Sequence, residues 1–128
     1  RPAEPPFDRG FYFPPTLFDQ VTPNLTIARD EIFGPVLGVI EWSDESEMLR
    51  AVNATDYGLT ASIYTRDLSM AHRLASSIEA GYIWINDVEK RWVGVPFGGQ
   101  KDSGTGTEYS LEELYSYTQN KTVSVNLA

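Results

Sequence analysis

Glu31-Ile32-Phe33-Gly34-Pro35-Val36 is the most informative stretch of this chain, and it leads into the nearly apolar run Val36 to Trp42. Glu31 and Phe33 stand two positions apart, so on an extended segment both side chains leave the backbone on the same side. A carboxylate beside an aromatic face suits a sugar diol that is joined to a flat ring. Gly34-Pro35 then predicts a bend before the apolar run, which is typical of a buried strand.

The size and composition are those of a globular domain with its own core: 128 residues, of which 41% are hydrophobic and 22% charged. The net charge of −8 argues against a nucleic-acid partner, because phosphate binding needs clustered Lys and Arg. The apolar runs are far shorter than the ~20 residues of a membrane span. No signal peptide pattern opens the sequence. We therefore expect no membrane partner and a cytoplasmic location.

The sequence holds no cysteine. This excludes disulfides, thiolate metal sites and thiol catalysis by this chain alone. The glycines from Gly98 to Gly106 do not form a phosphate-binding motif, because no Gly-Lys-Ser/Thr follows them. The first residues are Arg1-Pro2 rather than Met, which we interpret as a sign that the chain is a piece of a longer protein.

Hydrophobic periodicity and capping residues predict alternating strands and helices. The prolines of residues 1–15 predict an irregular or extended start. Strands are expected over residues 16–21, 36–42, 59–64, 82–85 and 122–127, and a long loop over 87–108. The first helix is expected to run from an N-cap at Ser43 to about Asn53 and to bury Met48, Leu49 and Val52. The second helix is expected to be capped by Asp67 and stopped by Gly81, and the third to begin at the capping box Ser110 and Glu113.

This order favours an α/β fold with a partial parallel sheet whose strands are joined by helical crossovers. The last segment, residues 122–127, alternates polar and apolar side chains strictly. Such alternation predicts a strand with one buried and one solvated face. Its late position in the chain suggests a sheet edge that another chain can pair with.

The run Asp30 to Val36 closely resembles the cofactor-clamp motif of the aldehyde dehydrogenase superfamily. Further stretches resemble the same superfamily in the same order, so the resemblance spans nearly the whole chain. The resemblance implies that this chain is the portion of such a protein that follows the catalytic cysteine. Residues 1–121 would be the C-terminal part of the catalytic domain, and residues 122–128 would be an oligomerisation strand. The matching stretches are residues 10–17, 53–59, 81–86, 96–99, 101–108 and 118–125.

The resemblance implies that Glu31 and Phe33 hold a nicotinamide cofactor, NAD or NADP. Glu31 would accept hydrogen bonds from the ribose hydroxyls next to the nicotinamide, and a carboxylate accepts both in charge-assisted form. Phe33 would pack near the nicotinamide ring and limit its swing, which matters because hydride transfer demands aligned atoms. The choice between NAD and NADP stays open, because the residue that contacts the adenosine ribose would lie upstream.

Residues 87–95 resemble the loop that shapes the aldehyde pocket in this family. Trp92 would be a pocket wall, and its charged neighbours would be rim residues that face water. Phe97 would lie near the reacting centre or simply pack in the core. Glu108 matches a glutamate that some members use in a proton relay, and a structural hydrogen bond is the alternative role.

The family also suggests a main-chain cation site and a subunit interface. The carbonyl oxygens of Lys101 and Gly104 match positions that bind a cation between subunits in some members, and such oxygens suit hard cations. Thr107 departs from the family, which usually has arginine there, so the resemblance does not carry the family's interface chemistry over to this loop.

Two function hypotheses follow. The first is the C-terminal portion of an NAD(P)-dependent aldehyde dehydrogenase, a homo-oligomer that oxidises a small-molecule aldehyde to a carboxylic acid, with the isolated segment inactive. The second is a non-catalytic module that keeps the aldehyde dehydrogenase fold for assembly. A third, an unrelated small α/β binding domain, requires every match to be accidental. In isolation the segment should expose apolar edges and either self-associate or stay partly disordered.

Overall fold

The structure is a computed structural model, and it describes residues 9–128. Pro2, Pro5 and Pro6, on which part of the expectation for residues 1–15 rests, lie outside the described residues. The chain divides into two compact units, Arg1–Thr55 and Asp56–Ala128, and each is described by itself.

The first unit contains a small parallel sheet. Strands β1 (Thr16–Phe18) and β2 (Val36–Gly38) pair with Thr16 opposite Val36, and the 3₁₀ helix η1 (Thr26–Ala28) lies between them in sequence. Both predicted strands are confirmed in position but are shorter than expected. The predicted burial is wrong for this chain, since Leu37 is 60% exposed. A strand is buried on both faces only where other elements cover the sheet, and pattern alone does not supply that cover.

Helix α1 (Glu45–Asn53) ends where predicted but begins one residue later than expected. Its N-cap is Asp44 rather than Ser43, because the Asp44 carboxylate accepts the Glu47 backbone N–H at 2.8 Å. Of the three side chains expected to be buried, Met48 and Leu49 are half-buried and Val52 is exposed.

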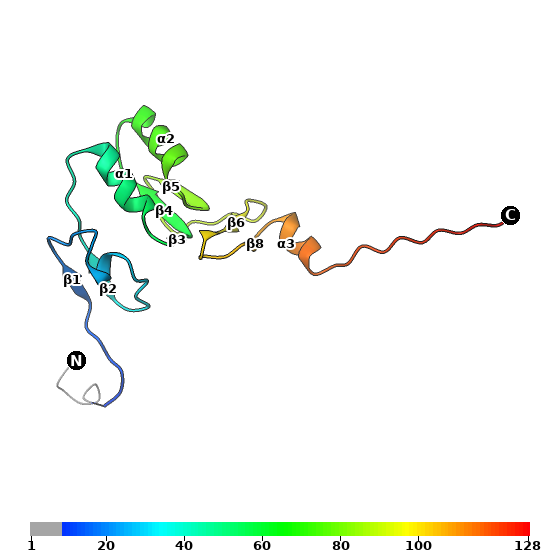
Figure 1. Cartoon of the computed structure of the whole chain (residues 1–128), viewed down its shortest axis with the longest axis horizontal. Helices are drawn as coiled ribbons and strands as arrows, with labels where there is room; N and C mark the ends of the chain where they lie inside the picture. Colours follow the sequence, from blue (N-terminus) through cyan, green and yellow to red (C-terminus); the bar gives the residue numbers. More distant parts are fainter. Residues whose placement is uncertain (1–8) are drawn as a thin grey trace. The chain divides into compact units, whose positions relative to one another are not determined.

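The second unit is built on a strand–helix–strand crossover, which confirms the α/β prediction (Figure 1). Strands β4 (Thr60–Ile63) and β5 (Tyr82–Ile85) are parallel neighbours, and α2 (Leu68–Ser77) connects them. Asp67 caps α2 as predicted, with its carboxylate accepting the Met70 backbone N–H at 3.0 Å. The buried apolar side chains of this unit are Ile63, Ala71, Leu74, Trp84 and Phe97.

Gly81 does not stop α2, contrary to the prediction. The helix ends at Ser77, and its C-cap Ile78 is extended. Gly81 lies instead against the backbone of Gly98, where a Cβ on Gly81 would collide with the Gly98 carbonyl oxygen. The glycine is required by a close approach between two segments, and helix-stop chemistry plays no part.

The long loop expected over residues 87–108 is partly folded into short strands. Strand β6 (Phe97–Gly98) pairs antiparallel with β8 (Thr107–Glu108), and β7 (Gln100–Lys101) pairs antiparallel with β3 (Tyr57–Gly58). A strand of two residues is too short to show a period in its sequence, so these pairings follow from tertiary contact and not from local pattern.

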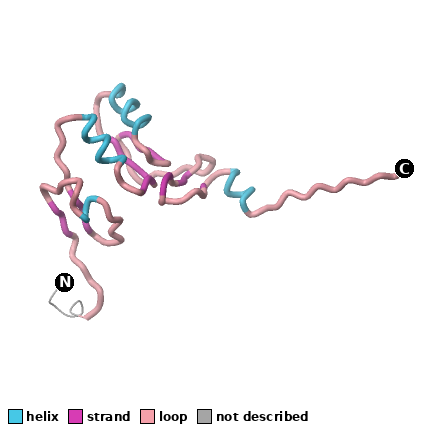
Figure 2. Tube along the Cα trace, viewed as in Figure 1, coloured by secondary structure: helices cyan, strands magenta, loops and turns pink. Residues whose placement is uncertain are grey.

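Helix α3 (Leu111–Ser116) forms as predicted, but the capping box predicted for Ser110 and Glu113 does not form. Ser110 is the N-cap, but its hydroxyl caps no backbone N–H of the helix, and Glu113 accepts the backbone N–H of Tyr109 at 2.8 Å rather than that of Ser110. The predicted strand over residues 122–127 does not form within residues 9–128, and Figure 2 shows the segment after α3 as loop. A strand needs a ladder partner, and this segment has none among the described residues.

Within residues 9–128, no helix combines the length and the apolar character needed to cross a membrane.

Candidate functional site

The segment from Glu31 to Val36 is shaped by consecutive tight turns. The Gly34 N–H donates to the Ile32 carbonyl and the Val36 N–H donates to the Gly34 carbonyl, each at 2.8 Å. Hydrogen bonds of this i to i+2 kind are typical of γ-turns at the start of strands. The bend predicted at Gly34-Pro35 is therefore present, and it delivers the chain into β2.

Both candidate cofactor residues, Glu31 and Phe33, are exposed to solvent. The Phe33 side chain is 95% exposed, and Glu31 is exposed as well. The Pro35 carbonyl accepts the Thr16 N–H at 2.9 Å, which ties the turn to β1. An open, mostly apolar hollow of about 450 Å³ is lined by Gly34, Pro35 and the first residues of β1 and β2. The segment thus presents a carboxylate and an aromatic ring to any ligand that reaches it.

Phe97 and Glu108, predicted separately from the sequence, are brought together by the structure. They are directly opposite each other in the β6–β8 pair. Side chains at directly opposed positions leave the sheet on the same face. Both line a pocket of about 370 Å³.

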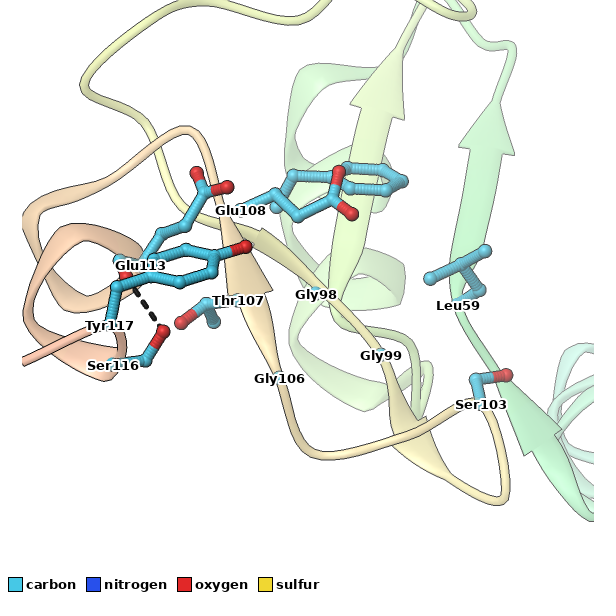
Figure 3. Close-up of a pocket in the computed structure, with 11 residues that line it drawn as sticks. Leu59, Gly98, Gly99, Ser103, Gly106, Thr107, Glu108, Glu113, Ser116 and Tyr117 are labelled. Atoms are coloured by element: carbon cyan, nitrogen blue, oxygen red, sulfur yellow. Dashed lines mark hydrogen bonds between the residues drawn. The ribbon is translucent and has the colours of Figure 1, made fainter.

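The walls of this pocket come from three parts of the second unit (Figure 3). Thr107 and Glu108 of β8 lie between Leu59 on one side and Tyr117, the residue that follows α3, on the other. Glycines of the β6–β8 turn region line the pocket between these walls. Glu108 is exposed within this chain, and its role in a proton relay stays a prediction.

Phe97 belongs to an aromatic cluster. The ring centroid of Phe97 is 5.7 Å from that of Tyr82 and 6.3 Å, edge on, from that of Tyr109. Tyr82 also lies 4.7 Å from Trp84. Such tilted and edge-on contacts are the favoured geometries of aromatic pairs. Phe97 is only 8% exposed, so it packs in the core of this unit while one part of it faces the pocket.

Arg91 makes a cation–π contact with one ring of this cluster. The Arg91 guanidinium carbon lies 4.2 Å from the centroid of the Phe97 ring, within cation–π range. The sequence prediction placed Arg91 with the rim residues, and it is indeed exposed. The contact with Phe97 was missed, because charged residues in a loop carry no periodic signal that reports which ring they cover.

The loop that carries Arg91 is held by hydrogen bonds on both sides. The Trp84 indole N–H donates to the Lys90 carbonyl and the Gly94 N–H donates to the Tyr109 carbonyl, each at 2.7 Å. Lys90 also pairs with Asp87 at 2.9 Å, and its ammonium lowers the pKa of the Asp87 carboxyl below the ordinary range. Trp92, the predicted pocket wall, is 65% exposed in this chain.

Lys101 and Gly104, the two residues of the candidate cation site, are close together, and each already has an interaction partner within the chain. The Gly104 N–H donates to the Lys101 carbonyl at 3.3 Å. The Lys101 ammonium pairs with Glu79 at 2.7 Å. Across residues 9–128 no group of three or more His, Cys, Asp or Glu side chains is arranged to hold a metal ion.

The small parallel sheets, the helical crossover and the exposed Glu31–Phe33 turn define an α/β protein with a candidate ligand clamp. The aldehyde dehydrogenase family model matches residues 1–123. The chain belongs to the aldehyde dehydrogenase family.

Relatives and solved structures agree with this membership. The chain is 53% identical over 125 residues to the aldehyde dehydrogenase tropH of Talaromyces stipitatus, covering 98% of this chain and 24% of that protein. It is 47% identical over 121 residues to a betaine aldehyde dehydrogenase of Brucella anthropi, covering 94% and 25%. An aldehyde dehydrogenase of Bacillus cereus in complex with NAD⁺ matches with a TM-score of 0.83 and 39% identity, covering 93% of this chain and 24% of that one. The chain thus spans about a quarter of the length of the curated relatives it matches.

Proposed function

We propose that this chain is the C-terminal part of an NAD(P)-dependent aldehyde dehydrogenase that oxidises an aldehyde to a carboxylic acid. The observation that carries the proposal is the exposed pair Glu31 and Phe33 on a turn fixed by backbone hydrogen bonds. Family membership and the solved relative in complex with NAD⁺ support it.

The residues present fit a nicotinamide nucleoside. The Glu31 carboxylate offers acceptors for two neighbouring hydroxyls, and an ionised acceptor makes the stronger kind of hydrogen bond. Phe33 offers an exposed ring face for a flat heterocycle. A bound nicotinamide cofactor supplies the hydride acceptor of the reaction. The role of Glu31 and Phe33 is to orient that cofactor.

The remaining site residues have proposed roles near the aldehyde. Phe97 and Trp92 would form walls of the pocket, and Glu108 would take part in moving a proton at the edge of the site. The main-chain carbonyls of Lys101 and Gly104 would contribute to a cation site between subunits. The structure supports a common location for Phe97, Glu108 and Trp92 within the second unit. Phe97 and Glu108 line one pocket, and the loop that carries Trp92 contacts Phe97 through Arg91.

The chain is proposed to act only as part of the longer protein. It holds no cysteine, and the thiolate that attacks the aldehyde in this family would come from another segment. Residues 122–128 would pair with a partner chain in a homo-oligomer. The cytoplasmic location stays a prediction, which cell fractionation checks.

A non-catalytic assembly module is the second candidate function. The observation that favours it is the absence of cysteine from the sequence. A transcript that joins this segment in frame to a cysteine-containing upstream region would rule it out, whereas a transcript encoding this segment alone would support it.

Glu31→Gln in the full-length protein tests the cofactor role. We expect kcat/KM for the cofactor to fall about tenfold or more, because a neutral amide replaces an ionised acceptor of two hydroxyl groups. The loss should appear in steady-state kinetics at saturating aldehyde. Glu41→Gln, at another exposed glutamate of the same unit, is the matched control and should leave kcat/KM unchanged. Equal kinetics for the two variants would contradict the role of Glu31.

A further inference from the structure

Among residues 9–128, Arg91 is a cation without an ionic partner, and it contacts Phe97, a residue that lines the candidate aldehyde pocket. Its guanidinium lies over the ring of Phe97, 4.2 Å from the centroid. The neighbouring Lys90 is neutralised by Asp87 at 2.9 Å. Among residues 9–128, Arg91 makes no ion pair, so its charge is available to a ligand.

The position of Arg91 is fixed by its surroundings. The carbonyl just before it, that of Lys90, accepts the indole N–H of Trp84, a side chain that is only 8% exposed. Three residues after Arg91, the Gly94 N–H is bonded to the Tyr109 carbonyl. The loop is therefore anchored on both sides of Arg91, and stacking on Phe97 restrains the side chain itself. A group held in this way is organised in advance for binding.

The chemistry of a stacked guanidinium selects acidic groups. When the flat group lies over a ring, its N–H donors remain free around its rim, where they match the two oxygens of a carboxylate. The charge is permanent, so it repels cationic ligands at any working pH.

Glu108 restricts where the acidic group can be. It is the cross-strand partner of Phe97 and lines the same pocket. A carboxylate next to the reacting carbonyl would meet this like charge if Glu108 lies at the reacting end. A carboxylate at the far end of the molecule would meet Arg91 instead.

We propose that Arg91 is the specificity residue of this enzyme and selects aldehydes that carry a carboxylate remote from the formyl group. The inference rests on the proposed function, because it needs the aldehyde to bind beside Phe97. It separates this protein from the relatives named for betaine aldehyde, a substrate that carries a trimethylammonium cation.

Three aldehydes of similar shape test the proposal with the full-length protein. Benzaldehyde is neutral, 4-carboxybenzaldehyde is anionic and 4-(trimethylammonio)benzaldehyde is cationic. We expect kcat/KM to be highest for the anion and lowest for the cation, with the ends of the series about a hundredfold apart. The enzyme should also oxidise betaine aldehyde poorly. A preference for the cation, or equal values for the three aldehydes, would overturn the inference.

The variant Arg91→Gln assigns the preference to this side chain. It should lower kcat/KM for 4-carboxybenzaldehyde about tenfold or more, mainly through KM, and leave benzaldehyde within about twofold. Arg91→Lys should restore part of the loss, because the charge returns without the bidentate fork. Arg66→Gln, at an exposed arginine for which the described residues show no cation–π contact, is the matched control and should change neither substrate. A preference that survives Arg91→Gln would overturn the assignment.

Benzaldehyde separates failure of this inference from failure of the proposed function. Oxidation of benzaldehyde without a charge preference refutes only the role of Arg91. A correctly folded full-length protein that oxidises none of the three aldehydes with NAD or NADP refutes the aldehyde dehydrogenase activity, and the inference with it.

Discussion

At the scale of single residues, Gly81 is the position where a small substitution should do the most damage. A Cβ on Gly81 would meet the backbone of Gly98, which cannot rotate away as a side chain can. We expect Gly81→Ala to destabilise the full-length protein by about 2 kcal/mol or more, in the range of overpacked sites. Thermal unfolding measures the effect.

Gly106→Ala is the matched control for Gly81. A Cβ at Gly106 meets no atom within 4 Å, and its φ lies outside the left-handed region. The control should therefore unfold at the temperature of the parent protein, or slightly above it. If the two alanine variants unfold together, the close approach of Gly81 to Gly98 is wrong.

The cap of α1 predicts a pH effect at Asp44. The Ser46 hydroxyl, which donates to Asp44 at 2.5 Å, and the Glu47 N–H lower the pKa of Asp44 below its ordinary value of 3.8. A lowered pKa means that the cap stabilises α1 fully above pH 3.8 and that this contribution is lost as the pH falls through the lower, folded value.

Ser46→Ala removes the largest cause of that shift. We expect the pKa of Asp44 to rise toward 3.8 in a carbon-13 NMR titration of the side-chain carboxyl. Ser76→Ala, whose hydroxyl donates to the His72 carbonyl of α2, should leave the titration of Asp44 unchanged. An Asp44 pKa that does not respond to Ser46→Ala would show that the hydroxyl is not its partner.

Residue-level prediction from the sequence worked where the cause is local. Asp67 was predicted as a cap because a cap needs only its own side chain and a backbone N–H three residues on. Gly81 was assigned the wrong role because its cause is a contact with a segment 17 residues away, 98 − 81. The placement of Arg91 over Phe97 has the same origin in tertiary contact and was not predicted.

At the scale of elements, helices were predicted better than strands. Helix α2 and strand β5 carry a clear period or a continuous apolar run, and both lie close to where the pattern put them. Strands β6 and β8 have two residues each and exist only because they pair. Their pairing is what joins Phe97 and Glu108 into one candidate site, so the residues were predictable and their proximity was not.

The segment over residues 122–127 carries the main untested prediction about an element. Its apolar side chains are exposed: 74% for Val123, 71% for Val125 and 94% for Leu127. The apolar face of the predicted strand is therefore not covered by this chain. If a partner chain covers them, changing all three to Ser in the full-length protein should dissociate the oligomer, because each buried side chain of this kind contributes about 1.5–3 kcal/mol. Sedimentation velocity measures the result.

The polar positions of the same segment provide the control. Thr122, Ser124 and Asn126 changed together to Ala should keep the oligomer intact, because they occupy the other face of the strand. An oligomer that is unaffected by the Ser substitutions would argue against pairing through this segment.

At the scale of the whole molecule, the chain leaves large apolar side chains uncovered. Phe33, Val93 and Leu127 are each more than nine-tenths exposed, and Leu37, Trp42 and Tyr117 are more than half exposed. Exposure on this scale is typical of surfaces that pack against other protein. We expect the isolated 128-residue chain to self-associate in sedimentation velocity and to bind a hydrophobic dye. A compact monomer that binds no dye would contradict this.

The central claim is that the chain contributes cofactor-orienting residues, but not the cysteine nucleophile, to a larger aldehyde dehydrogenase. Aldehyde-dependent reduction of NAD or NADP, measured side by side for the purified full-length protein and the isolated chain, tests it most directly. We predict turnover by the full-length protein and none by the isolated chain, which has no cysteine. Turnover by the isolated chain, or its absence from a folded full-length protein with both cofactors, would contradict the claim.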